Sequence, residues 1–104
     1  MKFETTPAFD SDYARLKPEH QEAFRAAVRE FAQACNDWAS APRGTFVWPA
    51  RLRVARLRGT RGLYEMTWSF ASPDGRATFE FVEGAGEVRC LWRRVGDHDV
   101  SGRP

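Results

Sequence analysis

The sequence has few of the features that cross-link, anchor or export a small protein. Its 104 residues include only two cysteines, which are too few and too far apart for a disulfide framework or a zinc motif. Cys35 and Cys90 both fall on apolar faces, so we expect them in the core. No run approaches the roughly 18 apolar residues of a membrane span. Residues 1–4 lack the apolar stretch of a signal peptide, so we expect a cytoplasmic protein.

The composition excludes a disordered chain, and the length excludes the larger enzyme folds. Hydrophobic residues make up 42% of the chain and aromatic residues 13%, whereas disordered segments are poor in both. A chain of 104 residues fits one compact domain and is too short for a barrel enzyme or a two-domain doubly wound fold. We expect a single domain over residues 1–100, followed by a flexible end at 101–104.

Lysine is also scarce, and the basic residues are unevenly distributed. Of the 16 basic residues 14 are arginine, and the formal net charge is only +2. Residues 1–40 carry five basic and seven acidic side chains, whereas residues 41–104 carry eleven and seven. From Arg43 to Arg61 the chain contains six arginines and no acidic residue. The small net charge therefore conceals a locally basic segment.

Two helices are predicted in the first part of the chain, after a short strand at Lys2–Thr6. Asp10 or Ser11 can cap the first helix, and Pro18 suits the first turn of the second. In the second helix, apolar residues recur at spacings of four, three, four and three, which predicts one buried face: Phe24, Val28, Phe31, Cys35 and Trp38. We expect this helix to end at 36–39.

The pattern changes to strands and turns after the second helix. Apolar and polar side chains alternate in four segments: 52–58, 64–70, 77–82 and 88–93. The first needs a bulge near Val54 or Ala55 to keep its alternation in phase. Ser72-Pro73-Asp74-Gly75 and Glu83-Gly84-Ala85-Gly86 are turn sequences, and residues 95–100 are expected to leave the sheet. These features predict an α+β fold, with an antiparallel sheet of four to five strands packed on the N-terminal pair of helices.

The arginines of the first strand segment are one candidate functional group. Arg51 and Arg53 share a face of the expected strand, and beyond the bulge Arg56 and Arg58 share a face too. Arg61 lies in the next turn. The planar guanidinium donates in pairs to phosphate oxygens, so this row suits a nucleic-acid backbone. An edge strand that carries charge only to remain soluble would have the same pattern.

A second candidate group lies near the end of the chain. Arg93 and Arg94 precede Asp97-His98-Asp99. Histidine is the side chain that most readily exchanges a proton near neutral pH, and a neighbouring aspartate could orient it. The alternative is a polar segment in which His98 is exposed and idle. A metal site is disfavoured, because three adjacent ligands cannot all point inward.

Arg76, Glu65 and Trp48 are further candidates. Arg76 begins a strand beside Glu65, where the two could belong to an active surface or form a cross-strand ion pair worth at most about 1 kcal/mol. Trp48 lies in a loop outside the buried phase and could make a stacking or partner contact. His20 is expected on the surface of the second helix.

Taken in order, these segments resemble the RelE/ParE superfamily of toxins from type II toxin–antitoxin systems, with the RelE/HigB-like branch favoured. The resemblance covers nearly the whole chain and rests on several segments: 9–16, the helix led by Pro18, 52–59, 62–66, 75–79 and 92–99. It implies a small sheet with two helices. It also implies a cognate antitoxin that wraps around the toxin and covers its basic surface.

For the RelE branch, the resemblance implies an endoribonuclease that cleaves mRNA in the ribosomal A site. The 2′-hydroxyl of the RNA attacks the adjacent phosphate, so no metal or other cofactor is implied. Arg53 and Arg56 match the family's basic positions, Arg76 matches the arginine that begins the middle strand, and His98 matches a C-terminal catalytic histidine. The C-terminal tyrosine, the second central histidine and the strand lysine used by some members are missing here.

We therefore expect His98, Arg76 and Asp97 to be catalytic. Phosphate binding is expected from a set of arginines: Arg51, Arg53, Arg56, Arg58, Arg61, Arg93 and Arg94. The expected partners are the antitoxin, the ribosome and mRNA, with no membrane, metal or small-molecule cofactor. The alternatives are a ParE-like toxin that inhibits DNA gyrase by binding alone, and a degenerate member that binds only its antitoxin. A titratable His98 favours the nuclease, because a protein that only binds has no need of it.

Overall fold

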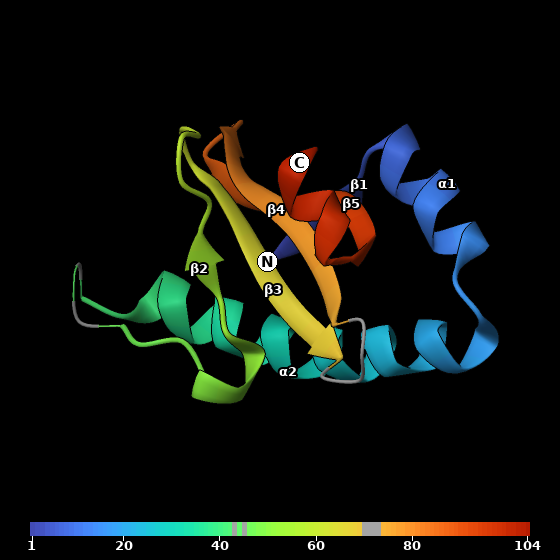
Figure 1. Cartoon of the computed structure of the whole chain (residues 1–104). Coiled ribbons are helices and arrows are strands. Elements are labelled where there is room, and N and C mark those ends of the chain that lie inside the picture. Colours follow the sequence, from blue (N-terminus) through green and yellow to red (C-terminus); the bar gives the residue numbers. More distant parts are fainter. Residues whose placement is uncertain (43, 45, 70–73) are drawn as a thin grey trace.

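The computed structural model describes residues 1–42, 44, 46–69 and 74–104, of which His98 is described in its backbone only. The elements follow in chain order (Figure 1): β1 (Lys2–Thr5), α1 (Pro7–Arg15), α2 (Pro18–Ser40), the 3-10 turn η1 (Ala50–Leu52), β2 (Ala55–Arg56), β3 (Leu63–Ser69), β4 (Gly75–Gly84), β5 (Glu87–Asp97) and the 3-10 turn η2 (His98–Gly102). The five strands form one sheet in the order β1-β5-β4-β3-β2. The predicted α+β fold is confirmed, except that β1 runs parallel to β5.

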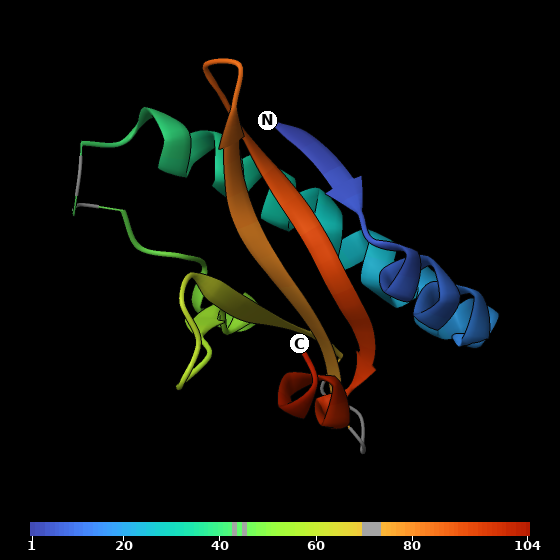
Figure 2. The same ribbon diagram turned by 90° about the horizontal axis from the view of Figure 1, so that it is seen from above.

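Helix α2 packs along one face of the sheet and buries the predicted apolar stripe (Figures 1 and 2). The ring of Phe31 lies 4.8 Å from that of Phe79 in β4 and 5.0 Å from that of Trp92 in β5. Phe24 contacts Trp68 of β3 edge-on, with ring centroids 6.1 Å apart. Full burial of each such side chain contributes about 1.5–3 kcal/mol, so this seam is the main source of stability. No helix among the described residues is long and apolar enough to cross a membrane.

Helix α1 begins earlier than predicted, because Thr6 is its cap rather than Asp10 or Ser11. The Thr6 hydroxyl oxygen accepts a hydrogen bond from the backbone N–H of Phe9 at 3.0 Å. The same hydroxyl donates to the carbonyl oxygen of Arg93 at 2.7 Å. The end of β1 and the start of α1 are therefore tied to β5 at one residue.

The predicted strand at 52–58 is wrong over most of its length. Ala50–Leu52 form η1, and Arg53 has a left-handed backbone with φ of 46°. Only Ala55–Arg56 pair with β3. Leu52 is buried in the core and Val54 packs against it, so these two apolar side chains reach the core from a turn. The alternation of apolar and polar residues therefore reflects these core contacts of a turn and not a strand.

Strand β5 continues beyond its predicted end. Val95, Gly96 and Asp97 pair with Ala77, Arg76 and Gly75 of β4, so the prediction that residues 95–97 leave the sheet is wrong. The ladder persists because β4 supplies partners down to its first residue. Element η2 then begins at His98. Residues 101–102 belong to η2, and the flexibility of 101–104 stays a prediction.

The turn between β4 and β5 is confirmed. Ala85 and Gly86 have φ values of 51° and 76°, and Gly84 pairs with Glu87 across them. Two successive positive φ values are typical of a type I′ hairpin turn. The other predicted turn, Ser72-Pro73-Asp74-Gly75, falls in the sequence between β3 and β4, which pair antiparallel. Its Ser72 and Pro73, together with Phe70, lie outside the described residues.

Candidate functional site

The side of the sheet opposite α2 carries a row of polar side chains, which we call the outer face: Glu65, Thr67, Arg76, Thr78, Glu80 and Arg93. They occupy this side because side chains alternate along a strand, and their neighbours Trp68, Phe79 and Trp92 point toward α2. Element η2 lies over one end of the outer face (Figures 1 and 2). The outer face is therefore the place where the predicted catalytic residues could meet.

Arg76 is held in a fixed position on the outer face. One guanidinium nitrogen donates to the hydroxyl oxygen of Thr67, which pairs with Arg76 across β3 and β4. Another lies 3.3 Å from a carboxylate oxygen of Asp74. The side chain is only 19% exposed, and its Nε is buried without a hydrogen-bond partner among the described residues. Arg76 is thus a largely enclosed cation whose Nε–H has no partner among the described residues.

Glu65 does not form the alternative ion pair with Arg76 within the described residues, because each has another partner. The carboxylate partner of Arg76 is Asp74. A carboxylate oxygen of Glu65 accepts a hydrogen bond from the Ser101 hydroxyl of η2. The contact between η2 and β3 therefore covers the carboxylate that lies near Arg76.

Asp97 and the backbone of His98 lie at the same end of the sheet as Arg76. Asp97 pairs with Gly75, the residue before Arg76, and His98 follows as the first residue of η2. A carboxylate oxygen of Asp97 accepts from the backbone N–H of Asp99 at 2.9 Å, which makes Asp97 the cap of η2. The side chain of His98 lies outside the described part of the structure. The three predicted catalytic residues therefore belong to one end of β4 and β5.

Arg93 and Arg94, which were expected to bind phosphate, both contact acidic groups of this chain. Arg93 lies 3.1 Å from Glu80 and donates to the backbone oxygen of Pro104 at 2.9 Å. Arg94 donates to both carboxylate oxygens of Asp12 in α1, at 2.6 Å and 3.0 Å. Hydrogen bonding to Asp12 raises the pKa of Arg94 above its ordinary value. Both guanidinium groups already have anionic partners.

Asp12 was not identified from the sequence, although a signal was available. It lies three residues after the buried Phe9 and four before Leu16, on the inward side of α1. A carboxylate on the apolar side of a helix requires a partner, since burying an unpaired charge is costly. Its partner is an arginine of the last strand, which a reading of local pattern cannot specify.

The predicted row of arginines does not form one surface. Arg51 is in η1 and pairs with Glu30 of α2, with its Nε 2.7 Å from the carboxylate. Arg56 pairs in register with Tyr64, and its guanidinium carbon lies 6.0 Å from the centroid of that ring. It therefore lies on the α2 side of the sheet, away from Arg76. Arg53 is in the left-handed turn after η1.

Arg58 and Arg61 lie beyond β2, in the connection to β3, and both are exposed. Among the described residues no carboxylate lies within ion-pairing distance of either guanidinium. Both therefore keep an accessible positive charge.

Trp48 and His20 differ from their predicted settings. The Trp48 ring stacks on Phe31 with centroids 5.5 Å apart and contacts Phe46 at 5.0 Å, so it packs on the core rather than standing free. His20 is half-buried and meets Trp68 edge-on at 5.9 Å. Both lie at the margin of the core, which extends beyond the residues that the sequence pattern predicted for it.

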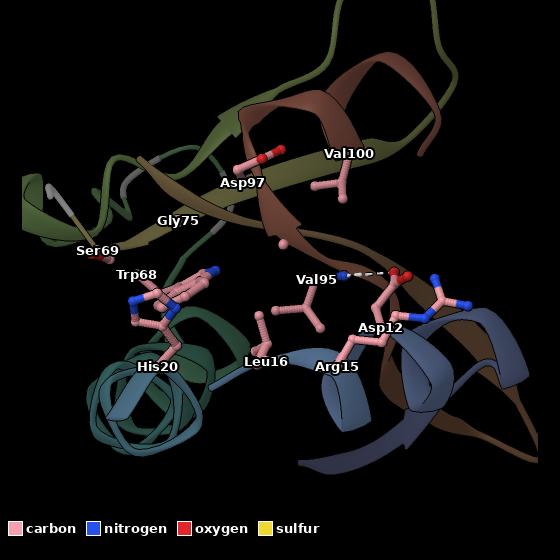
Figure 3. Close-up of a pocket in the computed structure, with 11 residues that line it drawn as sticks. Asp12, Arg15, Leu16, His20, Trp68, Ser69, Gly75, Val95, Asp97 and Val100 are labelled. Carbon is pink, nitrogen blue, oxygen red and sulfur yellow. Dashed lines mark hydrogen bonds between the residues drawn. The ribbon is translucent and has the colours of Figure 1, made fainter. Parts of the chain in front are cut away.

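His20 and Trp68 also line a pocket of about 370 Å³ beside the end of β5 (Figure 3). Asp12 of α1, Leu16 directly after α1 and Asp97 of β5 line it as well. The pocket opens between the two helices and the end of β5, and Val100 of η2 also lines it. Its lining mixes apolar and polar side chains and does not indicate one class of ligand.

The two cysteines are confirmed as core residues. Cys35 and Cys90 are fully buried and unpaired. Burial raises the pKa of the Cys35 thiol to about 12 and that of Cys90 further still, so neither forms a thiolate near neutral pH. No group of three histidine, cysteine or acidic side chains suited to a metal ion occurs among the described residues.

Comparison with known proteins supports the fold. No protein-family model and no curated protein matches the sequence. A solved structure of the YoeB/ParE toxin from Agrobacterium tumefaciens matches with a TM-score of 0.57 and 15% sequence identity. The match covers 94% of this chain and 99% of that chain. This chain therefore has the fold of a YoeB/ParE toxin.

Proposed function

We propose that this protein is the toxin of a type II toxin–antitoxin system and acts as an endoribonuclease. In this proposal it belongs to the RelE/HigB-like branch, cleaves mRNA on the ribosome in the cytoplasm, and is neutralised by a cognate antitoxin. The observation that carries the proposal is the enclosed guanidinium of Arg76 on the outer face, at the same end of the sheet as His98. The shared fold with a YoeB/ParE toxin supports it.

Arg76 is suited to hold the scissile phosphate. Thr67 and Asp74 hold its guanidinium in place, so binding of an anion costs little side-chain entropy. Its Nε is buried, so a phosphate would contact the terminal nitrogens and would share them with the Asp74 carboxylate. A cation in a partly enclosed site stabilises the charge that develops on the phosphoryl oxygens more strongly than an exposed one. Arg76 remains protonated throughout and transfers no proton.

The proton transfers are assigned to the C-terminal residues. Attack of the 2′-hydroxyl on the phosphate requires a base, and departure of the 5′-oxygen requires an acid. His98 can do either near neutral pH, and Asp97 adjoins it as a second candidate. Glu65 is a further carboxylate on the outer face, and its present partner is the Ser101 hydroxyl.

RNA outside the scissile bond would lie along the accessible arginines. Arg58 and Arg61 are proposed to contact phosphates, together with Arg53 and Arg56 at the same margin of the sheet. Arg51, Arg93 and Arg94 would join them only after leaving their carboxylate partners. The antitoxin, in this proposal, covers the same basic surface.

The test is to map mRNA ends on translating ribosomes after expression of the wild type, Arg76→Ala and His98→Ala. New cuts in the wild type that become much less frequent in both variants would support the nuclease. Arg29→Ala is the matched control, because Arg29 is exposed on α2 away from the outer face. Growth arrest with intact mRNA and a DNA-damage response would instead indicate a gyrase inhibitor. Absence of growth arrest in every form would indicate a degenerate member.

A further inference from the structure

Strand β3 contains one residue more than β4 immediately beside the position that pairs with Arg76. Thr67 pairs with Arg76, but Ser69, not Trp68, pairs with Gly75. Trp68 is therefore the extra residue of a β-bulge. Bulges bend a strand locally and re-aim the side chains beside them. This one lies next to the cation that the proposed reaction needs.

The indole of Trp68 lies directly against the backbone of Gly75 on the α2 side of the sheet. A Cβ atom at Gly75 would stand 2.4 Å from Cε2 of Trp68 and 2.6 Å from Cδ2 and Cζ2. Such distances leave no room for any side chain. Gly75 has an ordinary negative φ, so a glycine is required here by the approach of the indole and not by the backbone conformation.

The same indole is hydrogen-bonded to Arg76. Its ring N–H donates to the carbonyl oxygen of Arg76 at 2.8 Å. The guanidinium of Arg76 projects from the opposite face, toward Thr67. Trp68 thus holds the main chain of Arg76 from the core side, while the side chain is held from the outer side.

Helix α2 in turn fixes the indole. Phe24 contacts it edge-on with centroids 6.1 Å apart and planes at 87°. His20 contacts it at 5.9 Å and lies beside it at the pocket (Figure 3). Trp68 is only 8% exposed. The ring therefore has little freedom, and the position of α2 is transmitted to the backbone of Arg76.

We propose that Trp68 and Gly75 are positioning residues that fix the backbone of Arg76 and thereby aim its guanidinium at a phosphodiester. The nature of the ligand rests on the proposed function, whereas the positioning itself does not. Side chains that act on a reacting group need support from a second layer of contacts, because small displacements of a charged group are costly to the reaction. Here that layer is one indole and the glycine that admits it.

The direct test is an NMR measurement of the Arg76 side chain in ¹⁵N-labelled protein. Arg76→Lys identifies its Nε–H signal by the loss of that peak. Trp68→Phe removes the ring N–H and should shift or broaden the signal. Trp92→Phe is the matched control, since Trp92 is equally buried among aromatic rings but pairs with Phe79 and does not contact Arg76. An Arg76 signal that Trp68→Phe leaves unchanged would overturn the inference.

The functional test is a double-mutant cycle on mRNA cleavage. Trp68→Phe should lower kcat about tenfold or more with KM changed less than about twofold. The reason is that displacing the guanidinium weakens its interaction with the transition state more than its interaction with the bound substrate. In an Arg76→Ala background it should have no further effect, whereas Trp92→Phe should act additively with Arg76→Ala. Additive behaviour of Trp68→Phe would assign it a structural role only and overturn the inference.

His20→Ala provides a second variant in case Trp68→Phe does not fold. It removes the half-buried ring that contacts the indole and leaves the core rings in place. It should shift the Arg76 signal in the same direction as Trp68→Phe but less, and no shift would count against the inference. If the wild type cleaves no RNA, the proposed function fails, and the NMR measurements still decide whether Trp68 positions Arg76.

Discussion

Asp12 of α1 and Arg94 of β5 form an ion pair through two hydrogen bonds, at 2.6 Å and 3.0 Å. The Asp12 carboxylate also accepts the backbone N–H of Val95 at 3.2 Å, and it is only 9% exposed. Arg94 in addition donates to the backbone oxygen of Arg103 at 3.3 Å. The Asp12–Arg94 pair therefore links α1, the last strand and the segment that follows η2.

Asp12→Asn should lower the free energy of unfolding by about 2–4 kcal/mol, because it leaves the partly buried Arg94 without its counter-charge. Urea unfolding followed by circular dichroism measures the change. Asp10→Asn in the same helix is the control. Asp10 is exposed near the helix N-terminus, so its loss should cost less than about 1 kcal/mol. Equal losses in the two variants would contradict a special role for the Asp12–Arg94 pair.

Ala85 is the second testable position, because an alanine adopts a left-handed backbone there, with φ of 51°. A non-glycine residue without a polar side chain is disfavoured in this region, and type I′ turns prefer asparagine followed by glycine. Ala85→Asn should therefore raise the free energy of unfolding by about 0.5–1 kcal/mol. Thermal unfolding measures it. Ala85→Val should act in the opposite direction, and stabilisation by valine would exclude this explanation.

The elements predicted correctly from the sequence are those that local chemistry determines. Pro18 and the apolar spacing of α2 depend only on residues within one helix, and the 83–86 turn depends on two positive φ values. The prediction of a strand at 52–58 was wrong because apolar and polar residues can alternate in a segment that is not a strand. Arg53 reverses the chain, and Leu52 reaches the core from a turn.

The candidate site was predictable only in part. Arg76 and the His98 segment were singled out by residue type and position, and the resemblance in the order of motifs then implied their catalytic roles. The contacts that hold Arg76 depend on the register of β3 with β4 and on the bulge at Trp68, and neither follows from a single strand's pattern. The same is true of Arg94, whose partner Asp12 lies 82 residues away in the chain. Long-range pairing decides which arginines remain accessible.

The buried Cys35 predicts a loss of stability at alkaline pH. Burial raises its pKa from 9.0 to about 12, so the folded state keeps the thiol protonated where the unfolded state ionises. This contribution is complete below pH 9 and decreases from there to about pH 12, because the unfolded state then releases protons that the folded state retains. Urea unfolding at pH 8 and pH 10.5 measures it.

Cys35→Ala is the variant that isolates this effect from the titration of tyrosine and lysine. It should lose less stability than the wild type between the two pH values, although it starts lower because of the lost packing. A pH dependence identical to that of the wild type would show that the thiol of Cys35 is not the responsible group.

Arg58 and Arg61 predict how the protein binds single-stranded RNA. Both are exposed, and no carboxylate among the described residues pairs with them, so each is able to replace a counterion on a phosphate. Replacing either by alanine should weaken binding to all RNA sequences alike and reduce the slope of log affinity against log salt by about 0.7. Fluorescence anisotropy with a labelled oligonucleotide over a salt series measures both quantities. Arg29→Ala on α2 should leave the slope unchanged, and an equal effect of Arg29→Ala would mean that RNA binds the positive charge of the chain as a whole rather than this margin of the sheet.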